Sequence, residues 1–372
     1  MSEPDLDAYA LKSEAAQETP APDLPYRPPL PRSYRPRIAL VGAGGISAAH
    51  LTAYRAAGFD VAVICNRTRA KAEARRDEFF PEAEATDDIA RTLARDDIGV
   101  VDLTPHPAER LAMIETALQA GKHVLSQKPF VLDLDAGIRL ADLADENGVW
   151  LAVNQNGRWA PHLSWMREAV RAGLIGDLHS CDIGMHWNHQ WIAGTPFEEM
   201  DDLILYDFAV HWFDFLTSLI GDRAGSVFAT KARAAGQAVR PPLLANALVS
   251  FDGGQASFAF DGAAGFGSED RTVLSGSAGT LSSRGPDLST QEVALTTAAG
   301  IARPRLEGTW FMQGFVGTMG ALLKAVEDGA QPLNQARGNL DALALVFAAI
   351  ASARRGRPVV PGTVRSLAAA QE

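Results

Sequence analysis

Two hydrophobic periodicities take turns along residues 37–154. Short runs rich in Val, Ile and Leu occupy residues 37–42, 60–65, 99–105, 122–127 and 149–154. The segments between them have the apolar spacing of amphipathic helices, one ending at residue 57 and others at 68–79, 107–120 and 133–147. Short apolar strands separated by helices predict a parallel sheet covered on both faces. The fold class is therefore α/β here, with a doubly wound Rossmann domain over residues 37–155.

A different pattern follows over residues 156–372. A helix is expected from residue 161 to 173, and two more at about 311–328 and 336–354. Between them, residues alternate between apolar and polar and are punctuated by Asp-Gly and Gly-Gly pairs, which is typical of antiparallel hairpins. The strand-like runs are residues 226–234, 244–262 and 271–283. We expect an α+β domain with a large, mostly antiparallel sheet, one face on helices and the other open to form a homodimer or homotetramer.

The first 36 residues differ from both regions. They contain eight of the 21 prolines, so they cannot form a continuous helix and have little apolar surface to bury. We interpret residues 1–36 as an extended arm. Two alternatives remain open, a disordered tail and an arm that wraps around a neighbouring subunit.

Composition narrows the functional classes. The chain has 372 residues, enough for two domains, and a net charge of -11 that argues against nucleic acid as a partner. Cys65 and Cys181 are too few for a disulfide framework or a thiolate zinc site. The sequence has no secretion signal and no apolar run near the ~20 residues that span a bilayer. A cytoplasmic protein without membrane association is expected.

A glycine-rich turn follows the first strand of the Rossmann region. Gly42 permits a tight turn, and Gly44 allows close approach of a pyrophosphate to the backbone. Gly45, Ile46 and Ser47 then open a helix, whose N-terminus favours negative charge. Ser47 stands where the dinucleotide fingerprint has its third glycine, a packing position that tolerates a small side chain. The turn predicts a dinucleotide site; the alternative is a tight turn with no ligand.

The end of the second strand bears on the choice of cofactor. An NAD enzyme usually has an acidic residue here, on the ribose hydroxyls. This chain has Asn66 and Arg67 instead. Asn66 does not repel a 2′-phosphate and Arg67 could pair with it, so NAD(P) is expected with NADP slightly favoured. Arg67 could equally be a solvated surface residue.

Three candidate catalytic residues lie in two further segments. Asp207 and His211 are four residues apart in an apolar helical pattern, so both fall on one helix face. Alone, this pair could be a capped carboxylate and a satisfied core histidine. Lys128 follows the strand at 122–127, at the carboxyl edge where open α/β sheets bind ligands. A lysine at that edge is expected to face the nicotinamide.

These motifs resemble those of one family. GKHVLSQKPF at 121–130 resembles the Glu-Lys-Pro segment of the glucose-fructose oxidoreductase, inositol dehydrogenase and MocA family (Gfo/Idh/MocA), and LYDFAVHWFDFL at 205–216 resembles its Asp-x-Gly-x-His-x-x-Asp helix. Further matches are VDLTPHPAE, VNQNGRWAP and the C-terminal segment 339–361. The resemblance covers about residues 37–361 and leaves out the N-terminal arm.

The resemblance implies roles for individual residues. Lys128 would contact the nicotinamide ribose and the substrate hydroxyl, and His211 would act as the base in oxidation. Asp207 would orient the substrate and the imidazole. Whether the lysine or the histidine is the base stays open. The remaining residues expected to border the cofactor are Thr104, Pro105 and Gln127. The chain departs from the family pattern at Gln127, where glutamate is usual, and at Ala209, where glycine is usual.

Five residues are candidates for contacts with substrate. The segment 182–191 fits a strand leading into a loop, in which His186, His189 and Trp191 could bind hydroxyls and support a sugar ring. Packing beneath the loop is the alternative. A metal site is not expected, because residues three apart on a strand face opposite sides. Asn156 and Arg158 are further pocket candidates, although Arg158 could be a structural ion-pair partner.

Together these features predict an NAD(P)-dependent oxidoreductase. It would move hydride between the nicotinamide and a secondary alcohol or ketone of a sugar, glycoside or cyclitol. Two other functions are compatible with the same fold. One is an NAD-dependent glycosidase or lyase that uses transient oxidation, and the other is a non-catalytic nucleotide-binding sensor.

Overall fold

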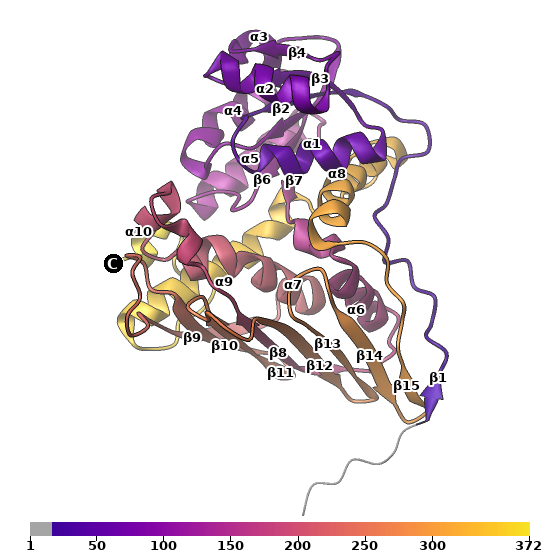
Figure 1. Ribbon diagram of the computed structural model, residues 1–372, viewed down its shortest axis with the longest axis vertical. Coiled ribbons are helices and arrows are strands. Elements are labelled where there is room, and N and C mark those ends of the chain that lie inside the picture. The colour runs from indigo at the N-terminus through magenta and orange to yellow at the C-terminus, as the bar shows by residue number, and fades with distance from the viewer. Residues whose placement is uncertain (1–16) are drawn as a thin grey trace, which may run out of the picture.

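The structure, a computed structural model, describes residues 17–372 and contains two sheets. The six-stranded sheet is parallel and the nine-stranded sheet is mostly antiparallel, and Figure 1 shows them at opposite ends of the molecule. This confirms the expected fold class, a doubly wound Rossmann region joined to an α+β region.

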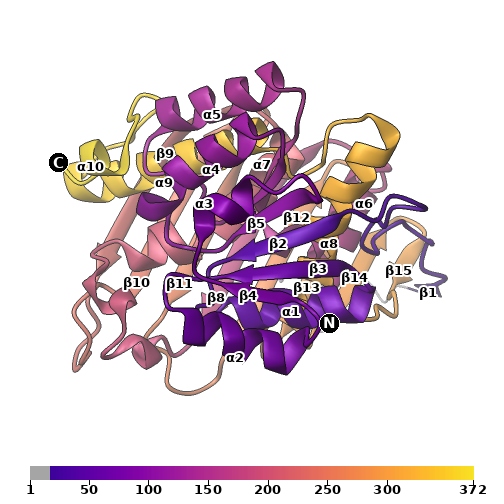
Figure 2. The same ribbon diagram turned by 90° about the horizontal axis from the view of Figure 1, so that it is seen from above.

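The parallel sheet has the strand order β4-β3-β2-β5-β6-β7. Its strands are β2 (Arg37–Val41), β3 (Asp60–Cys65), β4 (Glu84–Thr86), β5 (Ile98–Leu103), β6 (His123–Gln127) and β7 (Leu151–Asn154). Its helices are α1 (Ser47–Ala57), α2 (Arg69–Phe79), α3 (Ile89–Leu93), α4 (Pro107–Gln119) and α5 (Leu134–Glu146). Figure 2 shows α4 and α5 on one side of these strands and α1 and α2 on the other. The short elements β4 and α3 were not predicted, because they are too brief to show a periodicity.

The nine-stranded sheet has the order β1-β15-β14-β13-β12-β8-β11-β10-β9. Its strands are β1 (Glu18–Thr19), β8 (Leu178–His186), β9 (Ala224–Ala232), β10 (Leu244–Phe251), β11 (Gly254–Asp261), β12 (Glu269–Gly276), β13 (Gly279–Gly285), β14 (Glu292–Thr297) and β15 (Gly300–Ala302). Within this sheet, only the β8–β11 and β1–β15 pairs of described strands are parallel. The Asp252-Gly253 pair forms the expected hairpin turn, with Gly253 at φ +84°.

One face of this large sheet is covered by helices. These are α6 (Pro161–Arg171), α7 (Val210–Ile220) and α9 (Ala336–Arg355), which lie between the sheet and the Rossmann region in Figure 1. Within the described residues, α9 alone is long and apolar enough by composition to cross a membrane, but 72% of its apolar window is buried inside the protein. It is the central core helix of this region. The last helix, α10 (Leu367–Ala370), follows it near the C-terminus.

The other face of the sheet is open. On β9 and β10 the exposed side chains alternate with buried ones, as a half-buried antiparallel sheet requires. Phe228 and Leu248 are paired in register on this face and are 38% and 57% exposed. The open face therefore carries an apolar patch in an otherwise polar surface.

Helix α8 (Trp310–Asp328) returns from the second region to the first. It packs beside α1 (Figure 1), and Phe315, Met319 and Leu322 belong to the same buried cluster as Ile38 and Leu40 of β2. The C-terminal part of the chain thus completes the core of the parallel sheet. The domain boundary predicted at residues 155/156 assigns α8 to the second region only, although α8 also packs in the core of the first.

The described part of the N-terminal arm, residues 17–36, lies along its own chain. Strand β1 pairs with β15, and the Tyr26 side chain is buried. The Glu327 carboxylate at the end of α8 accepts the backbone N–H groups of Arg32, Ser33 and Tyr34 at 2.6–3.0 Å. The disordered-tail interpretation is wrong for residues 17–36, because these contacts order the segment on its own chain although it forms no helix. The rest of the expected arm, residues 1–16, lies outside the described residues.

Candidate active site

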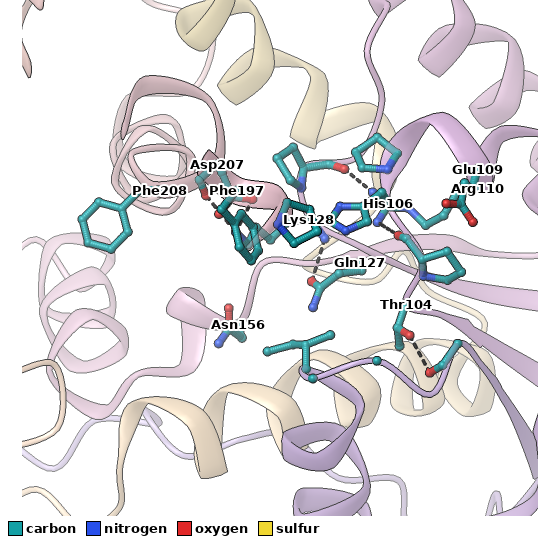
Figure 3. Close-up of a pocket in the computed structure, with 18 of the residues that line it drawn as sticks. Thr104, His106, Glu109, Arg110, Gln127, Lys128, Asn156, Phe197, Asp207 and Phe208 are labelled. Atoms are coloured by element: carbon teal, nitrogen blue, oxygen red, sulfur yellow. Dashed lines mark hydrogen bonds and ion pairs between the residues drawn. The ribbon is translucent and has the colours of Figure 1, made fainter. Parts of the chain in front are cut away.

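A cavity of about 720 Å³ opens at the carboxyl ends of the parallel strands. Its walls come from the glycine turn after β2, from the ends of β5 and β6, and from the segment between β8 and α7. Figure 3 shows side chains from these elements pointing into one space. Residues far apart in the sequence therefore share one site between the two regions.

The glycine turn is built for close approach of a ligand. Gly42 has φ +102°, and a Cβ atom there would overlap Thr104 Oγ1, so only glycine fits. A Cβ atom at Gly44 or Gly45 would meet no other atom within 4 Å, which leaves their backbone facing open space. Helix α1 starts directly afterwards and none of the described side chains caps it. The positive end of its dipole suits the negative charge of a pyrophosphate.

Ser47 has a different position from its neighbours. Its hydroxyl donates to the Gly44 carbonyl at 2.6 Å, and the residue is fully buried. The cavity is lined by Gly42, Gly44, Gly45 and Ile46, but not by Ser47. Ser47 holds the turn in shape because its side chain bonds to the backbone of the turn and does not face the cavity.

Asn66 and Arg67 lie at one end of the cavity. Asn66 Oδ1 accepts the Ala43 N–H at 3.0 Å, so this side chain supports the glycine turn. Arg67 is largely exposed and its Nη2 lies 3.2 Å from a carboxylate oxygen of Glu109. Lys71 lines the same end. The end of β3 therefore carries Asn66 and Arg67 where NAD-specific sites typically have an acidic residue, and the carboxylate at this end of the cavity comes from Glu109 of α4.

Thr104, Pro105 and Gln127 all line the cavity, as expected. The Thr104 hydroxyl donates to the Gly42 carbonyl at 2.8 Å, which joins the end of β5 to the glycine turn. Gln127 Oε1 accepts the backbone N–H of Lys128 at 2.7 Å. Thr104 and Gln127 therefore fix backbone at the cavity wall as well as bordering it.

Lys128 and Asp207 form an ion pair across the cavity. Lys128 Nζ lies 3.0 Å from Asp207 Oδ1 and donates to the Asp207 carbonyl at 2.7 Å (Figure 3). Both side chains are mostly buried, so solvent screens the pair only weakly. Asp207 lies in a π-helical turn, η5 (Ile204–Phe208), where Ala209 N–H donates to the Ile204 carbonyl. The regular helix expected through Asp207 begins only at Val210, and π-turns of this kind are frequent at functional sites.

His211 lies in the first turn of α7 and lines the same cavity. Its Nδ1 has no hydrogen-bond partner among residues 17–372. Burial, and secondarily the positive charge of Lys128, lower the pKa of His211 well below its usual value. The imidazole is therefore neutral at neutral pH and free to accept a proton.

The substrate-side candidates divide into two groups. Asn156, His189 and Trp191 line the cavity. The Trp191 ring is tilted relative to the His189 ring with centroids 6.0 Å apart, and the Trp187 ring stacks with the His189 ring at 5.8 Å. This aromatic row, with Phe197 and Phe208, forms one wall of the site.

His186 and Arg158 do not reach the cavity. His186 ends β8 on the exposed side of the strand, whereas the preceding Met185 is buried, because successive strand residues face opposite sides. Arg158 makes two hydrogen bonds to the Asp214 carboxylate, at 2.6 and 2.8 Å, and a third to the Leu333 carbonyl. Neither residue therefore lies where it was expected to contact the substrate. Arg158 is instead the partner in a structural ion pair, the alternative considered for it.

Several cavity residues were not found from the sequence. Arg110 is fully buried and donates to the carbonyls of Pro105, Pro129 and Phe130, so it joins the loop after β5 to the loop after β6 that contains Lys128. Burial lowers its pKa to about 9. The others include the aromatic residues Trp187, Phe197, Phe208, Trp212, Trp310, Phe311 and Phe315. Nothing in the sequence separates these aromatic residues from core residues, since both occur in apolar runs.

No metal site is evident in residues 17–372, where no group of three or more His, Cys, Asp or Glu side chains is placed to hold an ion. The fit to a dinucleotide is better founded. It depends on the unfilled glycine cradle at Gly44 and Gly45, the uncapped N-terminus of α1, and polar residues at both ends of the cavity.

Both regions of the chain match known protein-family models. Residues 36–155 match the family described as "Oxidoreductase family, NAD-binding Rossmann fold". Residues 163–282 match the "GFO/IDH/MocA C-terminal domain". The two matches together span most of the chain, including the glycine turn, Lys128, Asp207 and His211.

Two curated relatives are similar over nearly their full length. A D-apiose dehydrogenase of Paraburkholderia graminis is 27% identical over 334 residues, covering 86% of this chain and 88% of the relative. An inositol 2-dehydrogenase of Rhizobium meliloti is 26% identical over 331 residues, covering 87% and 98%. Among solved structures, an oxidoreductase from Agrobacterium radiobacter in complex with NAD+, L-tartaric acid and magnesium shares the fold, with a TM-score of 0.79, 20% identity and coverage of 88% and 99%.

Proposed function

Because the chain belongs to the Gfo/Idh/MocA family of oxidoreductases, we propose that it is a dehydrogenase or reductase of a neutral sugar, glycoside or cyclitol. The observation that carries this proposal is the convergence of Lys128, Asp207 and His211, from two regions of the chain, on the cavity that the glycine turn borders. The chain's own residues thus supply an acid–base set beside the place suited to a dinucleotide.

The mechanism assigns the proton steps to protein groups. A nicotinamide cofactor held by the glycine turn and the end of β5 would supply hydride transfer from the carbinol carbon or to the ketone. Lys128 donates a hydrogen bond to the substrate oxygen, and Asp207 keeps the ammonium group in place through its carboxylate and its carbonyl. The neutral His211 takes the hydroxyl proton as the carbon–oxygen double bond forms. The aromatic wall limits the water around these groups.

The proton step gives a prediction for pH dependence. Oxidation needs neutral His211, which is the form present at pH values above its pKa. Since burial and Lys128 lower that pKa, the acid limb of the kcat/KM profile should lie well below pH ~6.5, the usual value for histidine. We expect no inflection from His211 between about pH 6.5 and about pH 8. A profile that falls near pH 6.5, with this limb absent in His211→Asn, would contradict the assignment.

Three unpaired groups support a polyol substrate. His189 Nδ1, His211 Nδ1 and Trp212 Nε1 are buried and have no hydrogen-bond partner within residues 17–372, although all three residues line the cavity. Buried polar groups are normally paired, and hydroxyl groups of a bound sugar ring can both donate and accept. The row formed by Trp187, His189 and Trp191 offers apolar faces for the ring.

Charge favours a neutral ring over a sugar acid or phosphate. On the substrate side of the cavity, Lys128 is the one described ammonium group, and Asp207 already neutralises it. The curated relatives are named for D-apiose and inositol, both uncharged. The proposal is therefore limited to neutral polyols.

A screen of sugars, glycosides and cyclitols with NAD+ and NADP+ tests the function directly. Reduced cofactor measured by absorbance should accumulate with at least one neutral polyol. Glycoside cleavage without net reduced cofactor would instead favour the glycosidase or lyase alternative. Ligand binding without any turnover would favour a sensor.

For the cofactor, we propose that both NAD and NADP bind, with NADP preferred. Arg67→Ala should raise the KM for NADP+ about tenfold, the loss of one charge-assisted hydrogen bond, and leave the KM for NAD+ nearly unchanged. Arg69 is a matched control, because it is an exposed arginine on α2 that pairs with Glu73 outside the cavity. Equal changes for both cofactors, or a strong wild-type preference for NAD+, would reject the preference.

We also propose a homodimer or homotetramer that joins through the open face of the large sheet. The apolar pair Phe228 and Leu248 supports this surface.

A cytoplasmic location agrees with two buried, unpaired thiols at Cys65 and Cys181.

A further inference from the structure

A buried histidine lies directly behind the candidate active site. His50 is in the first turn of α1, fully buried, and its ring contacts side chains from three neighbouring strands. These are Asp102 of β5, Gln127 of β6 and Asn154 of β7. Phe315 of α8 packs against the ring, with centroids 4.3 Å apart. The mechanism above does not use this cluster.

The hydrogen bonds determine which ring nitrogen of His50 carries the proton. Nδ1 lies 2.7 Å from Asp102 Oδ2, a carboxylate oxygen that can only accept. Nε2 lies 3.0 Å from Asn154 Nδ2 and 3.3 Å from Gln127 Nε2, both amide nitrogens that can only donate. The proton is therefore on Nδ1, and Nε2 is an acceptor in a neutral ring.

This tautomer in turn determines how the Gln127 amide is oriented. Gln127 Oε1 accepts the Lys128 backbone N–H at 2.7 Å and Asn154 Nδ2–H at 3.2 Å. A flipped amide would turn its carbonyl toward the lone pair of His50 Nε2 and its NH₂ toward two donors. Because Gln127 and Asn154 are also paired in register on β6 and β7, the side chains have little freedom to separate.

We infer that His50 and Asp102 are positioning residues: they hold Gln127 in one orientation, and Gln127 holds the backbone from which Lys128 reaches the substrate. Glutamine at position 127 is matched to this tautomer, because a glutamate carboxylate has no N–H to give to Nε2. The kinetic part of the inference rests on the proposed function, whereas the structural part does not.

Asp102→Asn tests the inference with almost no change in shape. The asparagine amide can donate to His50 Nδ1, which moves the ring proton to Nε2, where it opposes the Gln127 NH₂ group. We expect kcat to fall by about 100-fold, the size of effect that a small misplacement of a catalytic group has. We also expect the Lys128 amide hydrogen, measured by NMR, to exchange with deuterium at least ~10-fold faster, since its acceptor turns away.

A second substitution should restore the network. In Asp102→Asn/Gln127→Glu the carboxylate is moved to the other side of the ring, so His50 Nε2–H can donate to Glu Oε2 while Oε1 still accepts from Lys128. The double variant should recover at least ~10-fold of the lost kcat and slow amide exchange at Lys128, a coupling visible in a double-mutant cycle. Tyr54→Phe is the matched control. It removes a hydroxyl that donates to Asp102 at 2.7 Å but leaves the tautomer unchanged, so kcat should change less than ~3-fold.

The outcomes separate the inference from the proposed function. Unchanged kcat and exchange in Asp102→Asn, or a double variant no better than Asp102→Asn, would overturn the positioning role. If the wild-type protein oxidises no polyol, the proposed function fails, but exchange at Lys128 still decides the structural claim. Nitrogen-15 shifts of the His50 ring in both proteins report the tautomer independently of folding stability.

Discussion

Lys128→Met should lower kcat by about 10²–10⁴-fold, the usual contribution of a positioned acid–base group. Methionine keeps the length of the side chain but removes the ammonium group that pairs with Asp207 and faces the substrate oxygen. His211→Gln should have a loss of similar size, since it removes the imidazole that takes the hydroxyl proton in the proposed mechanism. Steady-state kinetics on the polyol found by the screen would measure both.

Cofactor binding separates a catalytic loss from a folding loss. The dissociation constants for reduced cofactor, measured by fluorescence titration, should change by less than ~10-fold in Lys128→Met and His211→Gln, because the glycine turn remains intact. Lys324→Met is a suitable control, since Lys324 forms an exposed pair with Asp328 on α8. Near-normal kcat in both active-site variants would mean that the assigned residues do not carry the reaction.

Arg158→Met should destabilise the fold by about 3–5 kcal/mol, the cost of breaking a buried ion pair. Asp214 is 2% exposed and would keep only the Asn339 amide, 3.2 Å away, as a side-chain donor. Urea unfolding followed by tryptophan fluorescence would measure the change. At temperatures below the unfolding transition, the KM for the substrate should stay within a factor of ~2 of the wild-type value, because Arg158 does not line the cavity.

An exposed arginine supplies the control for this variant. Arg337 pairs with Asp142 and Asp145 at 2.7 and 2.8 Å, but its side chain is 45% exposed. Arg337→Met should cost less than ~1 kcal/mol. If Arg158→Met raised KM strongly and left unfolding unchanged, the substrate-binding interpretation of Arg158 would return and the structural one would be wrong.

The candidate site shows where reasoning from the sequence succeeds. The glycine turn could be placed because its residues are contiguous and their conformational requirements are local: Gly42 needs a positive φ, and a helix must start after it. Lys128 could be placed because the carboxyl ends of parallel strands share one edge. Both inferences depend on local properties of the sequence, namely contiguous motifs and the ends of predicted strands.

Other residues show where such reasoning fails. Arg158 is a charged residue of a kind often found in binding pockets. Only the position of Asp214, 56 residues away, shows that Arg158 forms a structural ion pair instead. His50 is a single polar residue in a helix, and its partners come from strands 52, 77 and 104 residues away. Asp207 was expected in a regular helix, whereas a π-helical turn carries its carbonyl toward Lys128.

The sequence by itself determined the two types of sheet, the order of their elements, the dinucleotide turn and the family, because periodicity and contiguous motifs are local properties of the chain. Only the tertiary structure decided which polar residues face the cavity, that α8 completes the core of the parallel sheet, and that residues 17–36 lie on their own chain. Those facts depend on contacts between residues far apart in sequence, whose directions are fixed only when the elements pack.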